Sequence, residues 1–188
     1  MPASALKKGY ILGAWKIPRP ISRALPKKED MLEVFTLLHV LISVLGICAG
    51  FGVVAAMPGG NVRHPWTGVF LAATLATSLT GFLFPFKGFT PALAFGVIST
   101  IVLALAIFAL KAKRLEGSWR KTYVINALIA QYLNTFVLIA QLFQKVPELK
   151  SLAPTQQEPA FGITQGLLLA VFVWLGFASV KGTKLKTA

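Results

Sequence analysis

Five apolar stretches of about 20 residues each constrain the fold of this 188-residue chain more than any other feature. They cover residues 32–57, 67–86, 92–110, 122–143 and 161–180. Apart from Glu33 at the start of the first stretch, none of them contains Asp, Glu, Lys or Arg. A helix needs about 20 mostly apolar residues to cross a bilayer. The sequence therefore predicts an all-α fold, a polytopic transmembrane bundle of about five spanning helices.

The composition agrees with a membrane protein and indicates what the charges contact. Hydrophobic residues make up 55% of the chain and charged residues 13%, with a mean hydropathy of +0.70, whereas globular domains carry about 25% charged residues. The 19 Lys and Arg give a net charge of +13 and lie between or beyond the apolar stretches. At such positions cations meet lipid headgroups. The expected partner is a lipid bilayer with anionic headgroups, and no nucleic acid.

The loops between the stretches predict which segments share a side of the membrane. Loop 111–121 carries five cations and one acid, whereas loop 144–160 is Pro-rich and nearly neutral, so we expect them on opposite sides. With the amino terminus outside, nine Lys and Arg lie inside and three outside, before residues 1–30 are counted. Those residues add seven cations, so the positive-inside rule does not decide the orientation. We expect the carboxyl terminus in the cytoplasm.

Residues 1–30 differ from the rest of the chain. The first 28 contain no acid, and four prolines interrupt any long helix there. This fits a basic cytoplasmic arm, an organelle transit peptide, or an extension upstream of a start at Met31. The predicted division is an arm or extension at 1–30, a transmembrane domain at 31–180 and a basic tail at 181–188.

Four aromatic residues lie at the ends of apolar stretches. They are Trp66, Trp119, Tyr123 and Phe161. Aromatic side chains are enriched where a bilayer meets water, so we expect these four at the membrane surface. Cys48 lies within the first stretch and has no second cysteine to pair with.

The first two stretches each carry small and polar residues at helical spacing. Lipid is as apolar as leucine, so transmembrane helices associate through small residues that pack closely and through interhelical hydrogen bonds. The two faces are natural partners for each other. The candidate helix-packing face consists of His39, Ser43, Gly46, Gly50, Thr74, Ser78 and Gly81.

The fourth stretch is the most polar, and its polar residues fall within about half of the helix circumference. An unpaired amide in hydrocarbon is costly, so Gln131 and Asn134 must contact other helices or trapped water. The opposite face, with Leu128 and Leu133, is expected to contact lipid. The polar face either joins helices or lines a pocket for a small neutral solute, a lipid headgroup or a quinone. The candidate pocket residues are Asn126, Gln131, Asn134 and Gln141.

No motif predicts catalysis, a metal site or a cofactor. The chain lacks H-E-x-x-H, G-x-S-x-G, Walker and Rossmann patterns. His39 is the only histidine within an apolar stretch, and His64 lies in a loop beyond the far end of that stretch, which disfavours a haem pair. A structural or proton-sensing histidine is the preferred interpretation. Ion-coupled transport usually needs a charge at depth in the membrane, and the stretches offer none.

Three segments carry a resemblance to a known group of proteins. They are TSLTGFLFPF followed by FTPA (77–92), WRKTYVINALIAQYLN (119–134) and LFQKVPELKSLAPTQQEP (142–159). Over about residues 31–180 the chain resembles a group of small uncharacterised multi-pass membrane proteins of bacteria. The resemblance implies a bacterial inner membrane and brings no functional residues with it.

Two functional hypotheses follow. The first is a non-enzymatic membrane protein that associates with itself or with a larger membrane complex through the small-residue faces of its first two helices. The alternative is a carrier or binder of a small neutral or lipid-like molecule that uses Gln131, Asn134 and Gln141.

Overall fold

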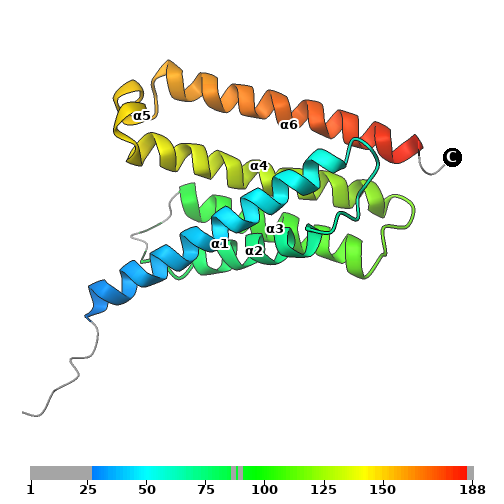
Figure 1. The fold of residues 1–188 in the computed structure, drawn as a ribbon, viewed down its shortest axis with the longest axis horizontal. Coiled ribbons are helices and arrows are strands. Elements are labelled where there is room, and N and C mark those ends of the chain that lie inside the picture. Colours follow the sequence, from blue (N-terminus) through cyan, green and yellow to red (C-terminus); the bar gives the residue numbers. More distant parts are fainter. Residues whose placement is uncertain (1–26, 86–87, 89–90, 186–188) are drawn as a thin grey trace, which may run out of the picture.

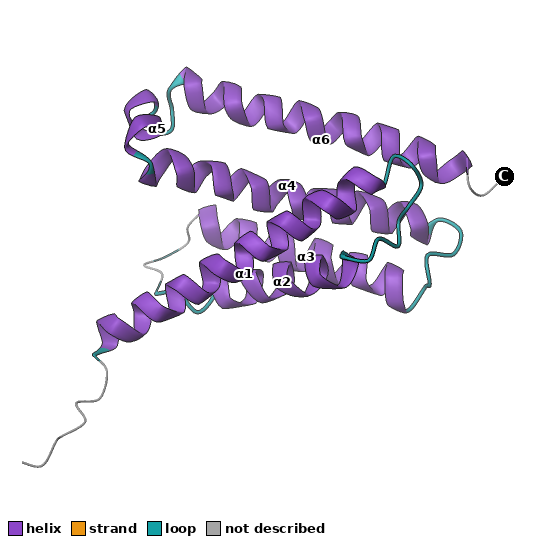
Figure 2. Cartoon of the chain, viewed as in Figure 1, coloured by secondary structure: helices purple, strands orange, loops and turns teal. Residues whose placement is uncertain are grey.

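The computed structural model describes residues 27–85, 88 and 91–185, and this part of the chain contains helices and no strand (Figures 1 and 2). The helices are α1 Lys28–Ala56, α2 Thr67–Gly81, α3 Pro91–Lys111, α4 Trp119–Lys145, α5 Pro147–Leu152 and α6 Pro159–Leu185. By length and composition, α1, α3, α4 and α6 can each cross a membrane, whereas α2 is shorter. The predicted all-α membrane bundle is confirmed. Most of the predicted amino-terminal arm, residues 1–26, lies outside the described residues.

Helix α2 is shorter than the predicted 20-residue span at 67–86. Its 15 residues extend about 22 Å at 1.5 Å per residue, less than the hydrocarbon thickness of about 30 Å. The helix ends at Gly81, where the chain enters turns closed by Phe82 N–H to Leu79 O and Leu83 N–H to Thr80 O. Pro85 then follows, and proline cannot continue a helix of this kind.

The chain nevertheless returns across the bundle through α2. Residue numbers along α2 decrease as those along the neighbouring α1 increase, since Thr80 lies beside His39 and Thr74 lies beside Gly46. Helices α1 and α2 are therefore antiparallel. Helix α3 pairs with α2 in the same antiparallel sense, since Phe82 lies beside Gly96 and Ser78 contacts Ser99. Helices α1 and α3 therefore run in the same direction, so α2 and its flanking turns must reverse the chain between them.

Local sequence explains where the other helices begin. Helices α3, α5 and α6 each begin with a proline, whose fixed φ and missing N–H suit the first turn. Helix α1 begins at Lys28, earlier than the predicted residue 32, with Glu29 and Asp30 in its first turn, where acids favour the helix dipole. Helix α6 continues through residues 181–185 of the predicted tail; residues 186–188 lie outside the described part.

The two ends of the bundle carry different charges. The segment 57–66, the α3–α4 connection and the end of α6 lie at one end, which we call the basic end, and the start of α1 and α5 lie at the other (Figure 1). The cations at the basic end whose side chains the structure describes are Arg63, Lys111, Lys113, Arg114, Arg120, Lys121 and Lys181, with Glu116 as the one such acid. Lys27, Lys28, Lys145 and Lys150 lie at the opposite end with Glu29, Asp30, Glu33, Glu148 and Glu158. Loops 111–121 and 144–160 thus lie at opposite ends, as predicted.

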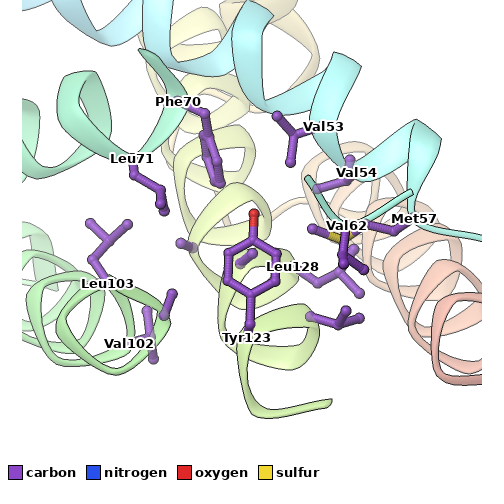
Figure 3. Close-up of a cluster of buried hydrophobic side chains, with 14 of the residues drawn as sticks. Val53, Val54, Met57, Val62, Phe70, Leu71, Val102, Leu103, Tyr123 and Leu128 are labelled. Carbon is purple, nitrogen blue, oxygen red and sulfur yellow. The ribbon is translucent and has the colours of Figure 1, made fainter. Parts of the chain in front are cut away.

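Helix α4 lies at the centre of the bundle, in contact with α1, α3 and α6. Tyr123 in its first turns is completely buried among side chains such as Phe70, Val53 and Leu103 (Figure 3). The prediction of Tyr123 at the membrane surface was therefore wrong. Leu128 and Leu133 are also buried, so the prediction that they face lipid was wrong as well. Because neighbours surround α4 on several sides, its apolar face is buried along with its polar one.

Helix α6 is attached mainly to α4. Aromatic rings join the two, including Tyr132 with Phe172 at 5.7 Å and Phe143 with Phe161 at 5.4 Å between centroids. Only 17% of its most apolar window is buried, the lowest share of the four long helices. Most of α6 thus remains available to lipid or to another protein.

Candidate functional site

The candidate packing face lies largely between α1 and α2. His39 Nδ1 and Thr80 Oγ1 are 2.8 Å apart, and Ser43 Oγ donates to Thr77 Oγ1 at 3.2 Å. Further along, a Cβ placed on Gly46 would lie 3.2 Å from Thr74 Oγ1. His39, Ser43 and Gly46 of the candidate face therefore contact α2 of the same chain.

Two contacts hold the ring of His39 in place. Its Nδ1 shares a hydrogen bond with the hydroxyl of Thr80, and either group can donate, depending on the tautomer of the ring. The ring also lies edge-on against Phe84, with the two centroids 5.0 Å apart. The arrangement supports a structural histidine.

Three residues of the candidate face have different or additional partners. Ser78 Oγ donates to Ser99 Oγ of α3 at 3.0 Å. Gly50 faces α4, where an added Cβ would overlap the side-chain oxygen of Gln131 and lie 2.8 Å from Phe70 Cδ2. Gly81 only approaches His39, 3.8 Å from its Cε1. The face therefore joins α1, α2, α3 and α4 rather than two helices alone.

The four candidate pocket residues do not share a cavity. Gln131 is fully buried and donates from Nε2 to Ile47 O of α1 at 3.0 Å. Asn134 Nδ2 donates to Thr74 Oγ1 of α2 at 3.1 Å, and Asn126 Nδ2 donates to Thr122 O of its own helix at 2.8 Å. Gln141 is exposed. Gln131 and Asn134 thus hydrogen-bond α4 to the first two helices.

Sequence reasoning missed two other amides, which hold α6 and the loop before it to α4. Gln165 of α6 is buried and donates to Phe136 O of α4 at 3.1 Å. Gln156, in the loop before α6, donates to Ala140 O at 2.7 Å and has a positive φ of 61°. Gln165 is the one glutamine in the apolar stretch 161–180. An isolated amide in such a stretch needs a hydrogen-bond partner, so the sequence did contain a signal for this contact.

Arg63 and Arg120 connect the segments of the basic end through hydrogen bonds to backbone carbonyl groups. Arg120 Nη2 donates to Gly60 O at 2.9 Å, and Arg63 Nη2 donates to Arg114 O at 3.0 Å. Arg114 has a positive φ of 49°, an uncommon conformation for a residue other than glycine. The segment after α1 is thereby tied to the α3–α4 connection and to the start of α4.

Two of the hollows on the described surface bear on this question. One, of 570 Å³, is formed by residues of α1 alone, including Glu29 and Glu33, and is an open side of that helix. The other, of 360 Å³, lies between three helices. We call it the apolar groove; it is lined by Phe51, Val54 and Ala55 of α1, Ile139 of α4, and Thr164, Leu167, Leu168, Val171, Phe172 and Leu175 of α6. None of the candidate pocket residues lines either hollow.

His39 and His64 are too far apart to bind the iron of the same haem. His64 lies beside Gly52, with Cε1 3.6 Å from a Cβ placed there. Gly52 is 13 residues from His39 along α1, about 20 Å at 1.5 Å per residue. Among the described residues, no group of three or more His, Cys, Asp or Glu side chains could hold a metal ion.

No family model matches the chain, and neither a curated protein nor a solved structure matches it.

Proposed function

We propose that this membrane protein is non-enzymatic and acts by association, either with itself or with a larger membrane complex, through one side of α6. That side, which we call the outer face, consists of Gly162, Gly166, Leu169, Val173 and Phe177. All five residues are exposed. Their spacing of four, three, four and four residues keeps them on one side of the helix.

The use of glycine within this chain is the observation that carries the proposal. A Cβ placed on Gly46, Gly50 or Gly96 would lie within 3.4 Å of a side chain on another helix or its flanking turn, so these glycines permit close packing. Gly162 and Gly166 have nothing within 4 Å. Glycine destabilises a helix by about 1 kcal/mol relative to alanine. Within the bundle, no close contact at Gly162 or Gly166 offsets that loss. A G-x-x-x-G pair lets two transmembrane helices approach closely.

The contacts of the first two helices explain why association is assigned to α6. The face of α1 and α2 that the sequence indicated for association is occupied inside the chain by hydrogen bonds such as His39 to Thr80. A partner could reach it only by displacing α2. The outer face of α6 needs no such rearrangement.

The test compares the Gly162→Leu/Gly166→Leu variant with Ala104→Leu, a control at an exposed position of α3. Both are expressed in native membranes, extracted in mild detergent and examined by native mass spectrometry. The unmodified protein and the control should appear as a homo-oligomer or with a co-purifying subunit, and the glycine variant should appear alone. A monomeric unmodified protein, or a glycine variant that keeps its partner, would refute the proposal.

The proposed location is a bacterial inner membrane, with the basic end in the cytoplasm. The bacterial origin rests on the resemblance of residues 31–180. The orientation rests on the cations of the basic end and leaves out residues 1–30, whose seven cations would otherwise balance them. Positively charged loops stay on the cytoplasmic side. The carboxyl terminus would then be cytoplasmic, and α5 would lie outside.

A further inference from the structure

The apolar groove between α1, α4 and α6 provides a second candidate site, away from the outer face of α6. Nine of its ten lining residues are hydrophobic. The tenth, Thr164, already donates its hydroxyl to Ala160 O at 2.8 Å. The groove therefore offers no free hydrogen-bond donor to a polar ligand, and its occupant must be apolar along its length.

The groove is elongated along α6. Its α6 wall runs from Thr164 to Leu175, about 16 Å at 1.5 Å per residue, and its volume is 360 Å³. An extended hydrocarbon chain lying along it has no polar group that needs a hydrogen bond. A protein helix packed over the groove instead would appear as a co-purifying subunit in the experiment below.

Toward the basic end, beyond the residues that line the groove, α6 meets the turn after α1. A Cβ on Gly182 of α6 would overlap the carbonyl oxygen of Pro58, so the two backbones touch. Gly60, two residues on, accepts the hydrogen bond from Arg120. The turn that meets α6 therefore lies beside a guanidinium, and Arg63 follows three residues later, donating to a carbonyl rather than to a carboxylate.

Charge at the two ends indicates the headgroup. Counting residues whose side chains are described, the basic end has seven cations and one acid, whereas the opposite end has four cations and five acids. A phosphate group is better stabilised beside Arg63 and Arg120 than at the opposite end, because guanidinium groups pair with phosphate oxygens.

We infer that the apolar groove binds one acyl chain of an anionic bilayer phospholipid, whose phosphate lies at the basic end near Arg63 and Arg120. The acyl chain lies between the α1 wall and the α6 wall of the groove. The lipid thereby fills the space that the protein's own side chains leave open beside α4.

The experiment fills the groove from each wall in turn. Ala55→Trp on α1 and Val171→Trp on α6 place a large ring in the groove, and Ala104→Trp and Val97→Trp on exposed positions of α3 are matched controls. Each protein is purified with equal amounts of phosphatidylglycerol and phosphatidylcholine carrying identical acyl chains. Native mass spectrometry then measures the lipid retained as loosely bound lipid is stripped by collisional activation. Circular dichroism checks that helical content is unchanged.

The expected result is one phosphatidylglycerol retained by the unmodified protein and both controls, with retention at least tenfold lower in the two groove variants. Equal retention in all five proteins, or none in the unmodified protein, would overturn the site. Equal retention of the two lipids would overturn the anionic headgroup. If one groove variant misfolds, the other still decides the outcome. Substitution of Gly162 and Gly166 should leave lipid retention intact, so this inference and the proposed function fail separately.

Discussion

At the scale of single residues, the packing of the bundle depends on glycines, which have no Cβ. The amide of Gln131 fits against α1 only because Gly50 has no Cβ there. The amide then reaches Ile47 O, which joins the buried interior of α4 directly to the α1 backbone. In hydrocarbon, no water can replace such a hydrogen bond. Gly50 and Gln131 thus act as one unit.

Gly50→Ala should destabilise the protein, because the added methyl group would overlap Gln131 and approach Phe70. Overpacking of this kind costs about 1–3 kcal/mol. The free energy of unfolding, measured by sodium dodecyl sulfate titration in mixed micelles, checks this. Gly176→Ala is the control, since nothing lies within 4 Å of it, and its stability should stay the same or rise. An equal loss in both variants would contradict the packing argument.

The hydrogen bond between Asn134 and Thr74 can be measured by a double-mutant cycle with Asn134→Leu and Thr74→Val. The amide donates to the hydroxyl at 3.1 Å. Interhelical hydrogen bonds measured this way contribute about 0.6 kcal/mol on average and about 1.7 at most. We expect a coupling in that range. A coupling of zero would mean that Asn134 has another partner in the membrane.

At the scale of elements, one carboxylate accepts several of the hydrogen bonds that order the loop before α6. Glu158 accepts hydrogen bonds from the backbone N–H of Thr155 at 3.2 Å and of Gln157 at 3.1 Å, and from the hydroxyl of Thr155 at 2.9 Å. Desolvation alone would raise the pKa of Glu158, but these hydrogen bonds outweigh it and hold the pKa below its usual 4.5. The loop leads directly into Pro159, where α6 begins.

The order of this loop should depend on pH. Because the folded pKa of Glu158 is depressed, its stabilising contribution is present above pH 4.5 and is lost as the pH falls through the lower, folded value. Hydrogen exchange at the Thr155 and Gln157 amides, corrected for the intrinsic pH dependence, should show protection at pH 7 that disappears in acid. Glu158→Gln should lose protection at pH 7, and Glu148→Gln should retain it. Protection that is unchanged in Glu158→Gln would contradict this role.

At the scale of the whole molecule, the distribution of charge separates the two ends. Counting residues whose side chains are described, seven cations lie at the basic end and four at the other. Arg63 and Arg120 tie the segment after α1 to the α3–α4 connection and to the start of α4 through backbone carbonyl groups. This arrangement gathers the cations of these segments at one end of the bundle.

The orientation can be checked with two fusions in a bacterial host. Green fluorescent protein at the carboxyl terminus should fluoresce, because it matures in the cytoplasm. Alkaline phosphatase inserted after Gln157, in the loop at the opposite end, should be active, because it needs the oxidising exterior. Inactive phosphatase with a dark fluorescent fusion would reverse the proposed orientation.

The sequence by itself determined the fold class, because a bilayer demands long apolar helices whatever their arrangement. It also determined that Gln131 and Asn134 need partners, since buried amides in hydrocarbon must be hydrogen-bonded. Only the tertiary structure decided which partners they have, because periodicity orients a face without naming the helix opposite it. The central position of α4 buried Tyr123, Leu128 and Leu133, which the sequence placed at the surface or in lipid. The groove beside α6 likewise arises from three segments far apart in the chain, and no local pattern could show it.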